Sequence, residues 1–461
     1  MELGAWSLEL GTCLVVVLLL YLAPLFLNAP LTDPDEGLHA AISQEMVERG
    51  DLIVPRFLRR PFLDKPILFF WAQAASMRVF GLNTAAARLP GLIFALLGIA
   101  TTGWLAAVLF SDAARADAGR AWSGPQVACM AAGCYATMVL PFLLAQAPVH
   151  DIALVPFTNL ALGSLWRSRW TPAGIVLGLS ILTKGFEGVA IVGAGYALYL
   201  LIARALTWRL IWRGALVVAI AVFVALPWYL AMNARQPGYL HYYFVDRHLL
   251  GFATATQEHH GQPWWYYLPL VIGGGLPWIV FVRRVSFDAP HRVAWSWLGS
   301  AIVLLTLSQS KAVTYILPAM PAIAILAVAS CAAQRVWRAV TLATAAIFAT
   351  ALFAFGPRLA EEHSARDLAA YFNASGRLPK TIFVFDQRVS FVYYLQPQLR
   401  SQLRDGQIQS VSVEQLAAMR PFPHDAVVTI PADLASARVP RILPLADATW
   451  DHVGRYVVVI P

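Results

Sequence analysis

Residues 31–66 read LTDPDEGLHAAISQEMVERGDLIVPRFLRRPFLDKP, a charged stretch that lies between long apolar segments. It holds four carboxylates in two clusters, Asp33-Pro34-Asp35-Glu36 and Asp64-Lys65-Pro66, together with a run of arginines. Charged groups kept close to hydrocarbon are costly, so such groups usually serve a function. The alternative interpretation is that these are solvated loop charges. The stretch is therefore both a predicted loop at a membrane surface and the first candidate site.

The composition is that of a membrane protein. Of the 461 residues, 59% are hydrophobic and 13% are charged, whereas a soluble domain carries roughly 25% charged residues. Apolar runs recur from residue 7 to residue 355, which predicts a polytopic α-helical membrane protein. The basic residues behind the net charge of +8 sit in short loops between apolar runs, so the charge does not indicate a nucleic-acid partner.

About eleven spans are predicted, with an error of about two. They lie near 7–28, 87–110, 125–143, 150–166, 171–184, 186–204, 213–232, 264–282, 293–309, 314–332 and 338–355. Between the first two, residues 36–48 are predicted to form an amphipathic helix in the membrane interface, with Ile42 and Met46 on its apolar side and Gln44 on its polar side. Residues 67–80 are short for a span and predict a second interfacial or re-entrant helix.

The tail differs in composition from the rest. From Pro357 onward it is polar, with strand-like runs at 381–386, 426–430 and 456–460 and a helical pattern at 364–373. We expect two domains, a transmembrane domain over 1–355 and a small soluble α/β domain over 356–461.

Loop charges predict the orientation. Alternate short loops hold twelve basic residues against three acidic ones, which places those loops and the N-terminus in the cytoplasm. The loops 29–86 and 233–263 and the tail are then outside. Arg49, Arg56, Arg59, Arg60 and Lys65 oppose the charge bias, and an anionic head group is their natural partner. Pairing with Asp51 and Glu48 is the alternative for one or two of them.

Three residues of the stretch carry the first chemical hypotheses. Asp35 follows the first apolar segment, and its carboxylate could take a proton from an acceptor hydroxyl or amine. Lys65 could pair with a phosphate. Asp64 could bind a metal or simply hold Lys65.

Further candidates lie beside later apolar segments. Asp151 opens one of them, where it could cap the helix or belong to a site. Lys184 and Lys311 could be anchors that extend toward solvent, or phosphate contacts. His260 together with Asp64 and water would make a divalent-metal site for Zn, Mg or Mn.

Seven short motifs, taken together and in this order, resemble a known family. They are DPDEG (33–37), GDLIVP (50–55), PFLDKP (61–66), RLP (88–90), LTKG (182–185), HGQPWWYY (260–267) and KAVTYILP (311–318). They are similar to motifs of the GT-C-fold glycosyltransferases that use polyprenyl-phosphate sugars, namely the aminoarabinose-lipid A transferases and the protein O-mannosyltransferases. The aminoarabinose branch is the more similar, because of the last two motifs and the tail.

The resemblance implies a GT-C fold and an inverting transfer from a polyprenyl-phosphate-linked sugar to lipid A or another envelope glycolipid. The reaction would take place on the outer side of the bacterial inner membrane. Asp35 matches the catalytic base and Asp151 a second site aspartate, while Asp64 and His260 match metal ligands. The residues expected at the donor phosphate are Lys65, Arg56, Arg59, Lys184, Lys311 and Tyr315.

This chain departs from that branch in several places. Asp64 stands where the branch has Glu, and the chain is shorter than typical members. Leu38 and His39 stand where the branch has Arg-Tyr, side chains that the resemblance puts near the donor phosphate and sugar. The protein could hold a different sugar, or use Arg56, Arg59 or Arg60 instead.

Two other functions stay open at this stage. One is protein O-glycosylation on the same fold. The other is a lipid or sugar transporter, which would show repeated halves and charges in broken helices at the membrane midplane. The sequence shows no convincing internal repeat, and its charges cluster in the predicted outer loops.

Overall fold

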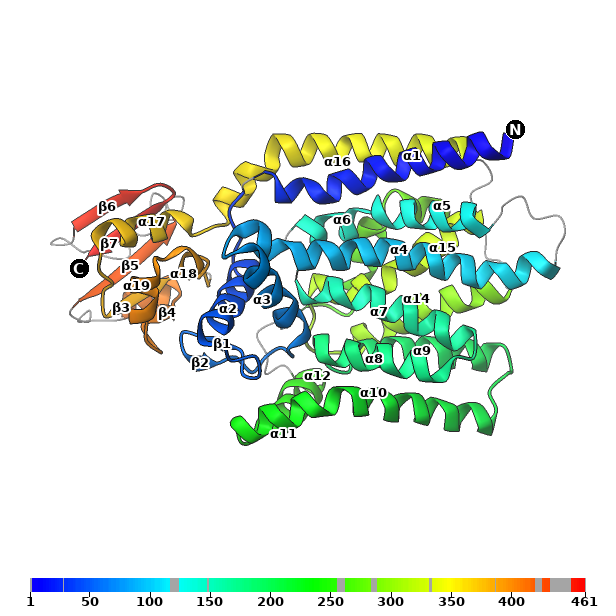
Figure 1. Ribbon diagram of the computed structural model, residues 1–461, viewed down its shortest axis with the longest axis horizontal. Helices are drawn as coiled ribbons and strands as arrows, with labels where there is room; N and C mark the ends of the chain where they lie inside the picture. Colours follow the sequence, from blue (N-terminus) through cyan, green and yellow to red (C-terminus); the bar gives the residue numbers. More distant parts are fainter. Residues whose placement is uncertain are drawn as a thin grey trace. The chain divides into compact units, whose positions relative to one another are not determined.

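The computed structural model describes residues 2–27, 29–116, 124–146, 149–254, 262–282, 288–330, 334–385, 387–418, 425–431 and 449–460. The chain forms two compact units (Figure 1). The first contains residues 1–26, 63–72 and 88–350, and the second contains 27–62, 73–87 and 351–461. The second unit thus combines the tail with most of the charged stretch. The domain division 1–355 and 356–461 stays a prediction.

Helices occupy each of the predicted apolar segments. They are α1 (Glu2–Leu22), α3 (Leu68–Phe80), α4 (Thr84–Ala116), α5 (Gly124–Ala136), α6 (Val139–Gln146), α7 (His150–Trp166), α8 (Trp170–Lys184), α9 (Glu187–Ile202), α10 (Trp208–Arg235), α13 (Tyr267–Gly274), α14 (Ala289–Leu307), α15 (Met320–Ser330) and α16 (Gln334–Glu362). Short 3-10 turns complete them at η1 (Ala23–Leu25), η3 (Trp278–Phe281) and η4 (Val313–Ala319). The mostly helical architecture is therefore confirmed.

Within the described part of the chain, three helices are long and apolar enough to cross a membrane by themselves: α4, α10 and α16. The pair α5 and α6 is bent by 65° and would make a fourth, broken span. These apolar helices fit an integral membrane protein. The count of about eleven spans stays a prediction, because many of the other apolar helices are shorter than a bilayer crossing requires.

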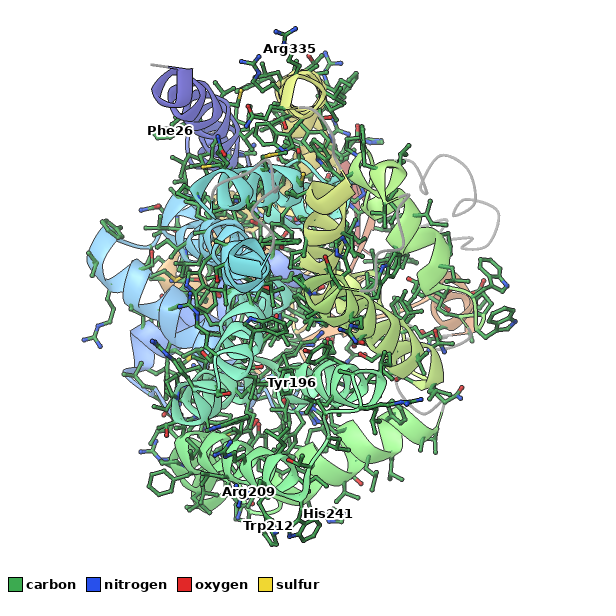
Figure 2. The ribbon with its side chains drawn as sticks, turned by 90° about the vertical axis from the view of Figure 1, so that its right-hand side faces the viewer. Phe26, Tyr196, Arg209, Trp212, His241 and Arg335 are labelled. Atoms are coloured by element: carbon green, nitrogen blue, oxygen red, sulfur yellow. The ribbon has the colours of Figure 1, made fainter. Side chains whose placement is uncertain are left out.

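The start of α10 shows how such a helix presents itself to its surroundings. Arg209 and Trp212 point outward, as does Arg335 of α16 (Figure 2). Trp208 and Trp212 are 68% and 61% exposed. Exposed tryptophans beside arginines are typical of a membrane–water interface.

Helix α8 packs against α10 through a small-residue motif. Gly174 and Gly178 lie one turn apart on the same face of α8. A Cβ at Gly174 would come within 2.7 Å of Ile220, and one at Gly178 within 2.8 Å of the Ala221 carbonyl oxygen. The two helix backbones therefore approach too closely for any larger side chain, as small-xxx-small motifs in membrane helices allow.

The second unit has its own sheet and core. Its strands are β3 (Thr381–Val384), β4 (Ile408–Ser410), β5 (Ala426–Pro431), β6 (Thr449–Val453) and β7 (Tyr456–Ile460), in the order β4-β3-β5-β7-β6. β3 runs parallel to β4 and β5, whereas β7 is antiparallel to β5 and β6. The small α/β tail expected from the strand-like runs is present.

Short helices and a hairpin accompany the sheet. The helices are α17 (Arg366–Ser375), α18 (Phe391–Tyr394), α19 (Pro397–Gln402), α20 (Val413–Ala418) and α2 (Asp35–Arg49), and the hairpin is formed by β1 (Arg56–Phe57) and β2 (Arg60–Pro61). Leu31, Ala40 and Ala41 of the charged stretch share one buried core with Phe372 and Phe391 of the tail. The stretch is therefore an integral part of the second unit.

Helix α2 is more buried than the amphipathic pattern predicted. Gln44, expected on the polar side, is 3% exposed, and His39 is 2% exposed. Its side chains are enclosed on most faces, because the helix contributes to the core just described. The expectation that Gln44 lies on an exposed polar face is therefore wrong. The expectation that the helix lies in the membrane interface stays a prediction.

Asp33 is the main polar connection inside the second unit. Its carboxylate accepts hydrogen bonds from the main-chain N–H groups of Val389 (2.8 Å) and Ser390 (2.6 Å) and from the Ser390 hydroxyl (2.6 Å). Burial raises the pKa of Asp33 to about 6, against the opposing effect of these hydrogen bonds. The folded chain thus holds a proton on Asp33 more tightly than an unfolded chain does.

This shift predicts a pH dependence of stability. Because the folded-state pKa lies above the ordinary 3.8, the contribution of protonated Asp33 is fully present below that value and is lost as pH rises through about 6. Asn is neutral throughout, so the unfolding midpoint of the parent should fall relative to that of Asp33→Asn between about pH 4 and 6. The control is Asp35→Asn, which alters an exposed carboxylate nearby. A parent–variant difference that stays constant with pH would contradict the expectation.

Candidate functional site

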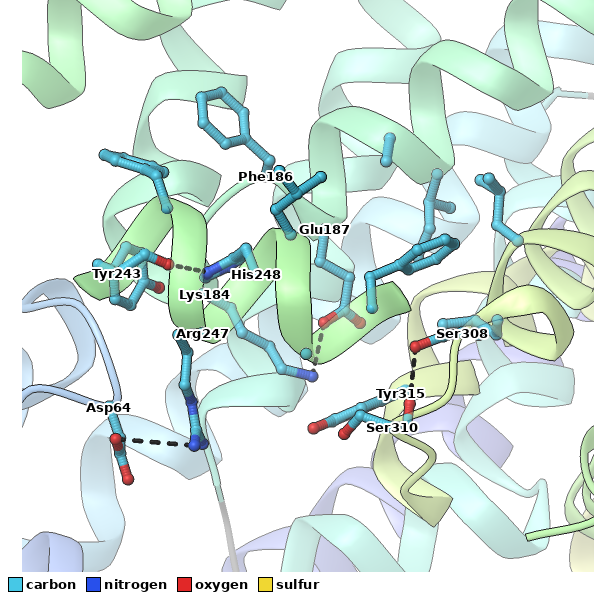
Figure 3. A pocket seen from close by; sticks show the side chains of 18 of the residues that line it. Asp64, Lys184, Phe186, Glu187, Tyr243, Arg247, His248, Ser308, Ser310 and Tyr315 are labelled. Carbon is cyan, nitrogen blue, oxygen red and sulfur yellow. Dashed lines mark hydrogen bonds and ion pairs between the residues drawn. The ribbon is translucent and has the colours of Figure 1, made fainter. Parts of the chain in front are cut away.

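The first unit contains a cavity of about 420 Å³ (Figure 3). One part of its wall is charged and the other part is apolar. The charged side chains are Asp64, Lys65, Lys184, Glu187 and Arg247, and the larger apolar ones are Phe186, Ile191, Phe244, Leu249, Phe252, Leu304 and Leu305. Such a wall fits a ligand with an anionic group and a hydrocarbon part.

A buried ammonium lies at the centre of the charged wall. Lys184, the last residue of α8, is 6% exposed and donates to Asp151 of α7, while its Nζ lies 2.8 Å from a carboxylate oxygen of Glu187 on α9. The same Nζ lies 3.7 Å from the centre of the Tyr315 ring. Two carboxylates and an aromatic face thus compensate one buried cation, as burial of a charge requires.

This arrangement decides between alternatives that the sequence left open. The N-cap position of α7 is Val149, so Asp151 does not cap the helix; its carboxylate binds Lys184 and Thr314 instead. Lys184 does not extend toward solvent as an anchor would. Asp151 therefore belongs to the charged cluster of the cavity.

Asp64 and Lys65 reach this cavity from the short segment 63–72 of the first unit. Lys65 lines the wall and lies near enough to Asp151 and Glu187 for a direct electrostatic interaction. One oxygen of Asp64 accepts a hydrogen bond from the Tyr242 hydroxyl at 2.6 Å and lies 3.7 Å from the Arg247 guanidinium. The sequence-predicted residues Asp64, Lys65, Asp151, Lys184 and Tyr315 are thus brought together.

Tyr242 and Arg247 belong to a π-helix that the sequence analysis missed. The helical segment starts with α11 (Tyr239–His241), continues as the π-helix η2 (Tyr242–Leu250) and ends with α12 (Gly251–Ala253). Single-turn π segments occur frequently at functional sites. The missed signal was a run of aromatic and basic residues, HYYFVDRH (241–248), in a predicted outer loop.

His248 of this π-helix packs on the turn after Lys184. Its Nδ1 lies 2.7 Å from the Tyr243 carbonyl oxygen, and the ring also hydrogen-bonds the Lys184 main chain. Burial lowers the pKa of His248 below its usual value. Gly185 makes the approach possible, because it has a φ of +76° and a Cβ there would lie 2.4 Å from His248 Nε2. The glycine of the LTKG motif is therefore a packing requirement of the cavity wall.

The remaining predicted residues lie elsewhere. Lys311 is buried and donates to the Ser308 carbonyl oxygen, so it is not an anchor extending to solvent. Asp35, Arg56 and Arg59 belong to the second unit. Asp35 is the exposed first residue of α2.

The arginines of the charged stretch have protein partners within the second unit. Arg49 pairs with Glu45 at 3.8 Å, Arg56 with Asp51 at 3.9 Å, and Arg60 with Asp405 at 3.7 Å. Arg59 donates to the Ser401 carbonyl oxygen. Pairing within the protein is thus more extensive than the one or two cases expected.

A divalent metal was expected between Asp64 and His260. His260 lies outside the described residues. On the described side, Asp64 Oδ1 accepts a hydrogen bond from the Tyr242 hydroxyl and lies 3.7 Å from the Arg247 guanidinium, which would repel a cation. Among the described residues, no three His, Cys, Asp or Glu side chains gather closely enough to hold a metal ion. A metal between Asp64 and His260 stays a prediction.

Comparisons with known proteins bear on this cavity and fold. No family model matches the chain. The undecaprenyl phosphate-alpha-4-amino-4-deoxy-L-arabinose arabinosyl transferase of Aeromonas hydrophila is 30% identical over 351 residues, which cover 72% of this chain and 60% of the relative. The enzyme of the same name from Pseudomonas savastanoi pv. phaseolicola is 34% identical over 332 residues, 68% of this chain and 59% of the relative.

The fold has solved counterparts. The crystal structure of ArnT from Cupriavidus metallidurans bound to undecaprenyl phosphate matches with a TM-score of 0.70 and 22% identity, covering 100% of this chain and 98% of that one. Its apo structure matches equally well, with a TM-score of 0.70. The resemblance to the aminoarabinose transferases is confirmed. The chain has the GT-C fold of ArnT, and its alignment spans about 60% of the length of the curated relative from Aeromonas.

The contact between Gly185 and His248 gives a testable expectation. Gly185→Ala forces an L residue to a positive φ and places its Cβ against the imidazole. We expect the variant to lose about 1–3 kcal/mol of stability, measured as a lower midpoint of thermal unfolding in detergent.

Gly193→Ala is the matched control, because Gly193 lies within α9 and a Cβ there meets nothing within 4 Å. It should leave the midpoint unchanged or raise it slightly. Equal midpoints for Gly185→Ala and the parent would contradict the packing role of Gly185.

Proposed function

We propose that this protein is a glycosyltransferase that moves a sugar from undecaprenyl phosphate, or a similar polyprenyl phosphate, to an envelope glycolipid such as lipid A. The observation that carries the proposal is the cavity of the first unit, in which a cluster of cations adjoins an apolar wall. The relatives named as arabinosyl transferases support the reaction class. The ArnT crystal structure with undecaprenyl phosphate supports the lipid.

The cationic part of the cavity suits a lipid phosphate. Lys184 is already compensated by Asp151 and Glu187, so its charge mainly holds the wall together. Lys65 and Arg247 are the more accessible cations, and Arg247 is 24% exposed at its side chain. An ammonium and a planar guanidinium are complementary phosphate ligands, one acting as a compact charge and the other as a two-pronged donor.

The apolar part suits the polyprenyl chain. Phe186, Phe252, Leu304 and Leu305 line the same cavity as the cations. A hydrocarbon chain against these side chains is removed from water, which stabilises the complex by roughly 25 cal/mol for each Å² of apolar area buried. The phosphate end then fixes the position of the reacting carbon.

We assign the sugar transfer itself to a displacement that inverts the configuration of the anomeric carbon. Asp35 takes the proton from the acceptor, the acceptor oxygen or nitrogen bonds to the anomeric carbon, and the bond from that carbon to the phosphate oxygen breaks. The leaving polyprenyl phosphate keeps the bonding electron pair, and Lys65 and Arg247 stabilise its charge. Because a phosphate monoester is a fair leaving group, no acid is needed to protonate it. Asp151 acts through Lys184, which it holds in the wall.

The cellular setting follows the loop charges. The N-terminus is assigned to the cytoplasm of a bacterial cell, and the reaction and the tail to the outer side of the inner membrane. None of these steps is routed through a divalent metal.

Donor binding tests the phosphate part of the proposal. Lys65→Ala should weaken binding of undecaprenyl phosphate about tenfold or more, because it removes a charge that meets the phosphate. The measurement is a titration of the purified protein with the lipid in detergent. Lys65→Arg should restore binding only in part, since a guanidinium does not replace a compact ammonium. The control is Lys380→Ala, which removes the same charge from an exposed position in the tail. Unchanged affinity in Lys65→Ala would remove Lys65 from this role.

The rate of sugar transfer tests the assignment of Asp35 as the base. Asp35→Asn should reduce sugar transfer by about 10²–10⁴-fold, the usual contribution of general base catalysis, and leave undecaprenyl phosphate binding intact. Product formation is followed by mass spectrometry of envelope lipids after incubation with polyprenyl-phosphate sugars.

Glu36→Gln is the matched control for that variant. Glu36 accepts hydrogen bonds from the Thr32 N–H at 2.8 Å and from the Thr32 hydroxyl at 3.0 Å, so it serves the start of α2 rather than the acceptor. A large loss of turnover in Glu36→Gln, together with normal turnover in Asp35→Asn, would identify Glu36 as the base and contradict the assignment of Asp35.

A further inference from the structure

We infer that the π-helical winding of η2 serves to fix the Arg247 guanidinium in the cavity, with Asp64 as the bridge and Tyr242 as the residue that holds the bridge in place. This inference rests on the proposed binding of a lipid phosphate in the cavity. It adds a positioning residue, Tyr242, that contacts neither the phosphate nor the sugar.

The first argument is geometric. Tyr242 and Arg247 are five positions apart, yet both reach the same oxygen of Asp64. In an α-helix with about 3.6 residues per turn, side chains five apart point roughly 140° away from each other. In a π-helix the repeat is i to i+5, so such side chains lie on one face. The π winding thus brings Tyr242 and Arg247 to one face of the helix, where one carboxylate contacts both.

A second pair repeats the pattern one position along. Tyr243 and His248 are also five apart, with ring centres 4.5 Å from each other and the imidazole bonded to the Tyr243 carbonyl oxygen. His248 packs on the turn after Lys184. The π-helix therefore attaches to α8 through one pair and to Asp64 through the other. Figure 3 shows Arg247 reaching Asp64 and His248 reaching Tyr243.

The third argument concerns the chemistry of the bridge. Burial, together with the hydrogen bond to Asp64 and its charge, raises the pKa of Tyr242 to about 12. The phenol therefore stays protonated at ordinary pH and acts as a donor. A carboxylate fixed by this donor has one orientation in which to hold a guanidinium, whereas an unfixed one can rotate. Fixing a ligand group before binding reduces the entropy that binding must overcome.

The cluster also balances charge locally. Asp64 lies 3.7 Å from the Arg247 guanidinium, whose charge it opposes, and it adjoins Lys65 in sequence. When a lipid phosphate binds, Arg247 can share its donors between Asp64 and the phosphate, since a guanidinium has five N–H groups in a planar fork. Asp64 thus compensates the charge of a guanidinium, as a carboxylate ligand compensates the charge of a metal ion in a metal site.

The test removes one oxygen atom. Tyr242→Phe keeps the aromatic ring and deletes the donor to Asp64. We expect the affinity for undecaprenyl phosphate to fall about three- to tenfold, in line with the net contribution of one ordinary hydrogen bond, because this one affects the phosphate only through Arg247. The donor KM should rise with kcat little changed. Tyr239→Phe is the matched control, because its hydroxyl lies in the same aromatic cluster and has no hydrogen-bond partner among the described residues.

A double-mutant cycle separates positioning from a structural effect. In an Arg247→Ala background, Tyr242→Phe should cause no further loss of affinity, because the residue acts through the missing guanidinium. Additive losses would mean that Tyr242 acts independently of Arg247 and would overturn the inference. So would loss of binding on adding a chelator with recovery on adding a divalent metal, because a metal would then occupy the place of the bridge.

The outcomes also separate this inference from the proposed function. If the parent protein does not bind undecaprenyl phosphate, the proposed function fails. If the parent binds it and Tyr242→Phe binds it equally well, only the positioning role fails.

Discussion

The first unit depends on the burial of one ammonium group. Lys184 is buried, where an unpaired charge would be very unfavourable, and it is compensated by Asp151 and Glu187. The three charges come from the ends of α7, α8 and α9, so meeting this requirement brings three helix ends to one place. Removing Lys184 would leave two buried carboxylates without the cation that pairs with both, the most costly change for such a cluster.

The cavity around this cluster contains two cations, Lys184 and Arg247, that have different roles. Lys184 lies between the carboxylates of Asp151 and Glu187 and is 6% exposed, while Arg247 lies 3.7 Å from Asp64 and is 24% exposed at its side chain. The first stabilises the wall, and the second is the more accessible to a ligand. This division follows from local charge alone and explains why neighbouring basic side chains are not interchangeable.

Much of the fold and part of the site could be predicted from the sequence. Apolar segments marked the helices, and strand-like runs marked β3, β5 and β7, because burial imposes a regular pattern on both. Motifs led to Asp64, Lys65, Lys184 and Tyr315, which line the cavity. Periodicity could not reveal η2, because an i to i+5 helix has no familiar apolar repeat. It therefore hid Tyr242 and Arg247.

Two other differences between prediction and structure also arise from features that the local sequence pattern does not show. The amphipathic pattern of α2 counted Gln44 as outward-facing, but a pattern cannot tell when a second layer from the tail covers the polar side as well. Asp33 looked like a plain neighbour of Asp35, yet it is bound by Val389 and Ser390, more than 350 residues later in the chain. Partners so distant in sequence leave no local signal.

The close contact of α8 and α10 has a consequence for substrate traffic. With glycine on one helix against side chains and carbonyl oxygens of the other, the pair leaves no crevice for an acyl or isoprenoid chain. At Gly174 and Gly178 these two helices pack as one layer. For the proposed lipid donor, we therefore expect an entry path along another helix boundary of the first unit, with this layer as its fixed side.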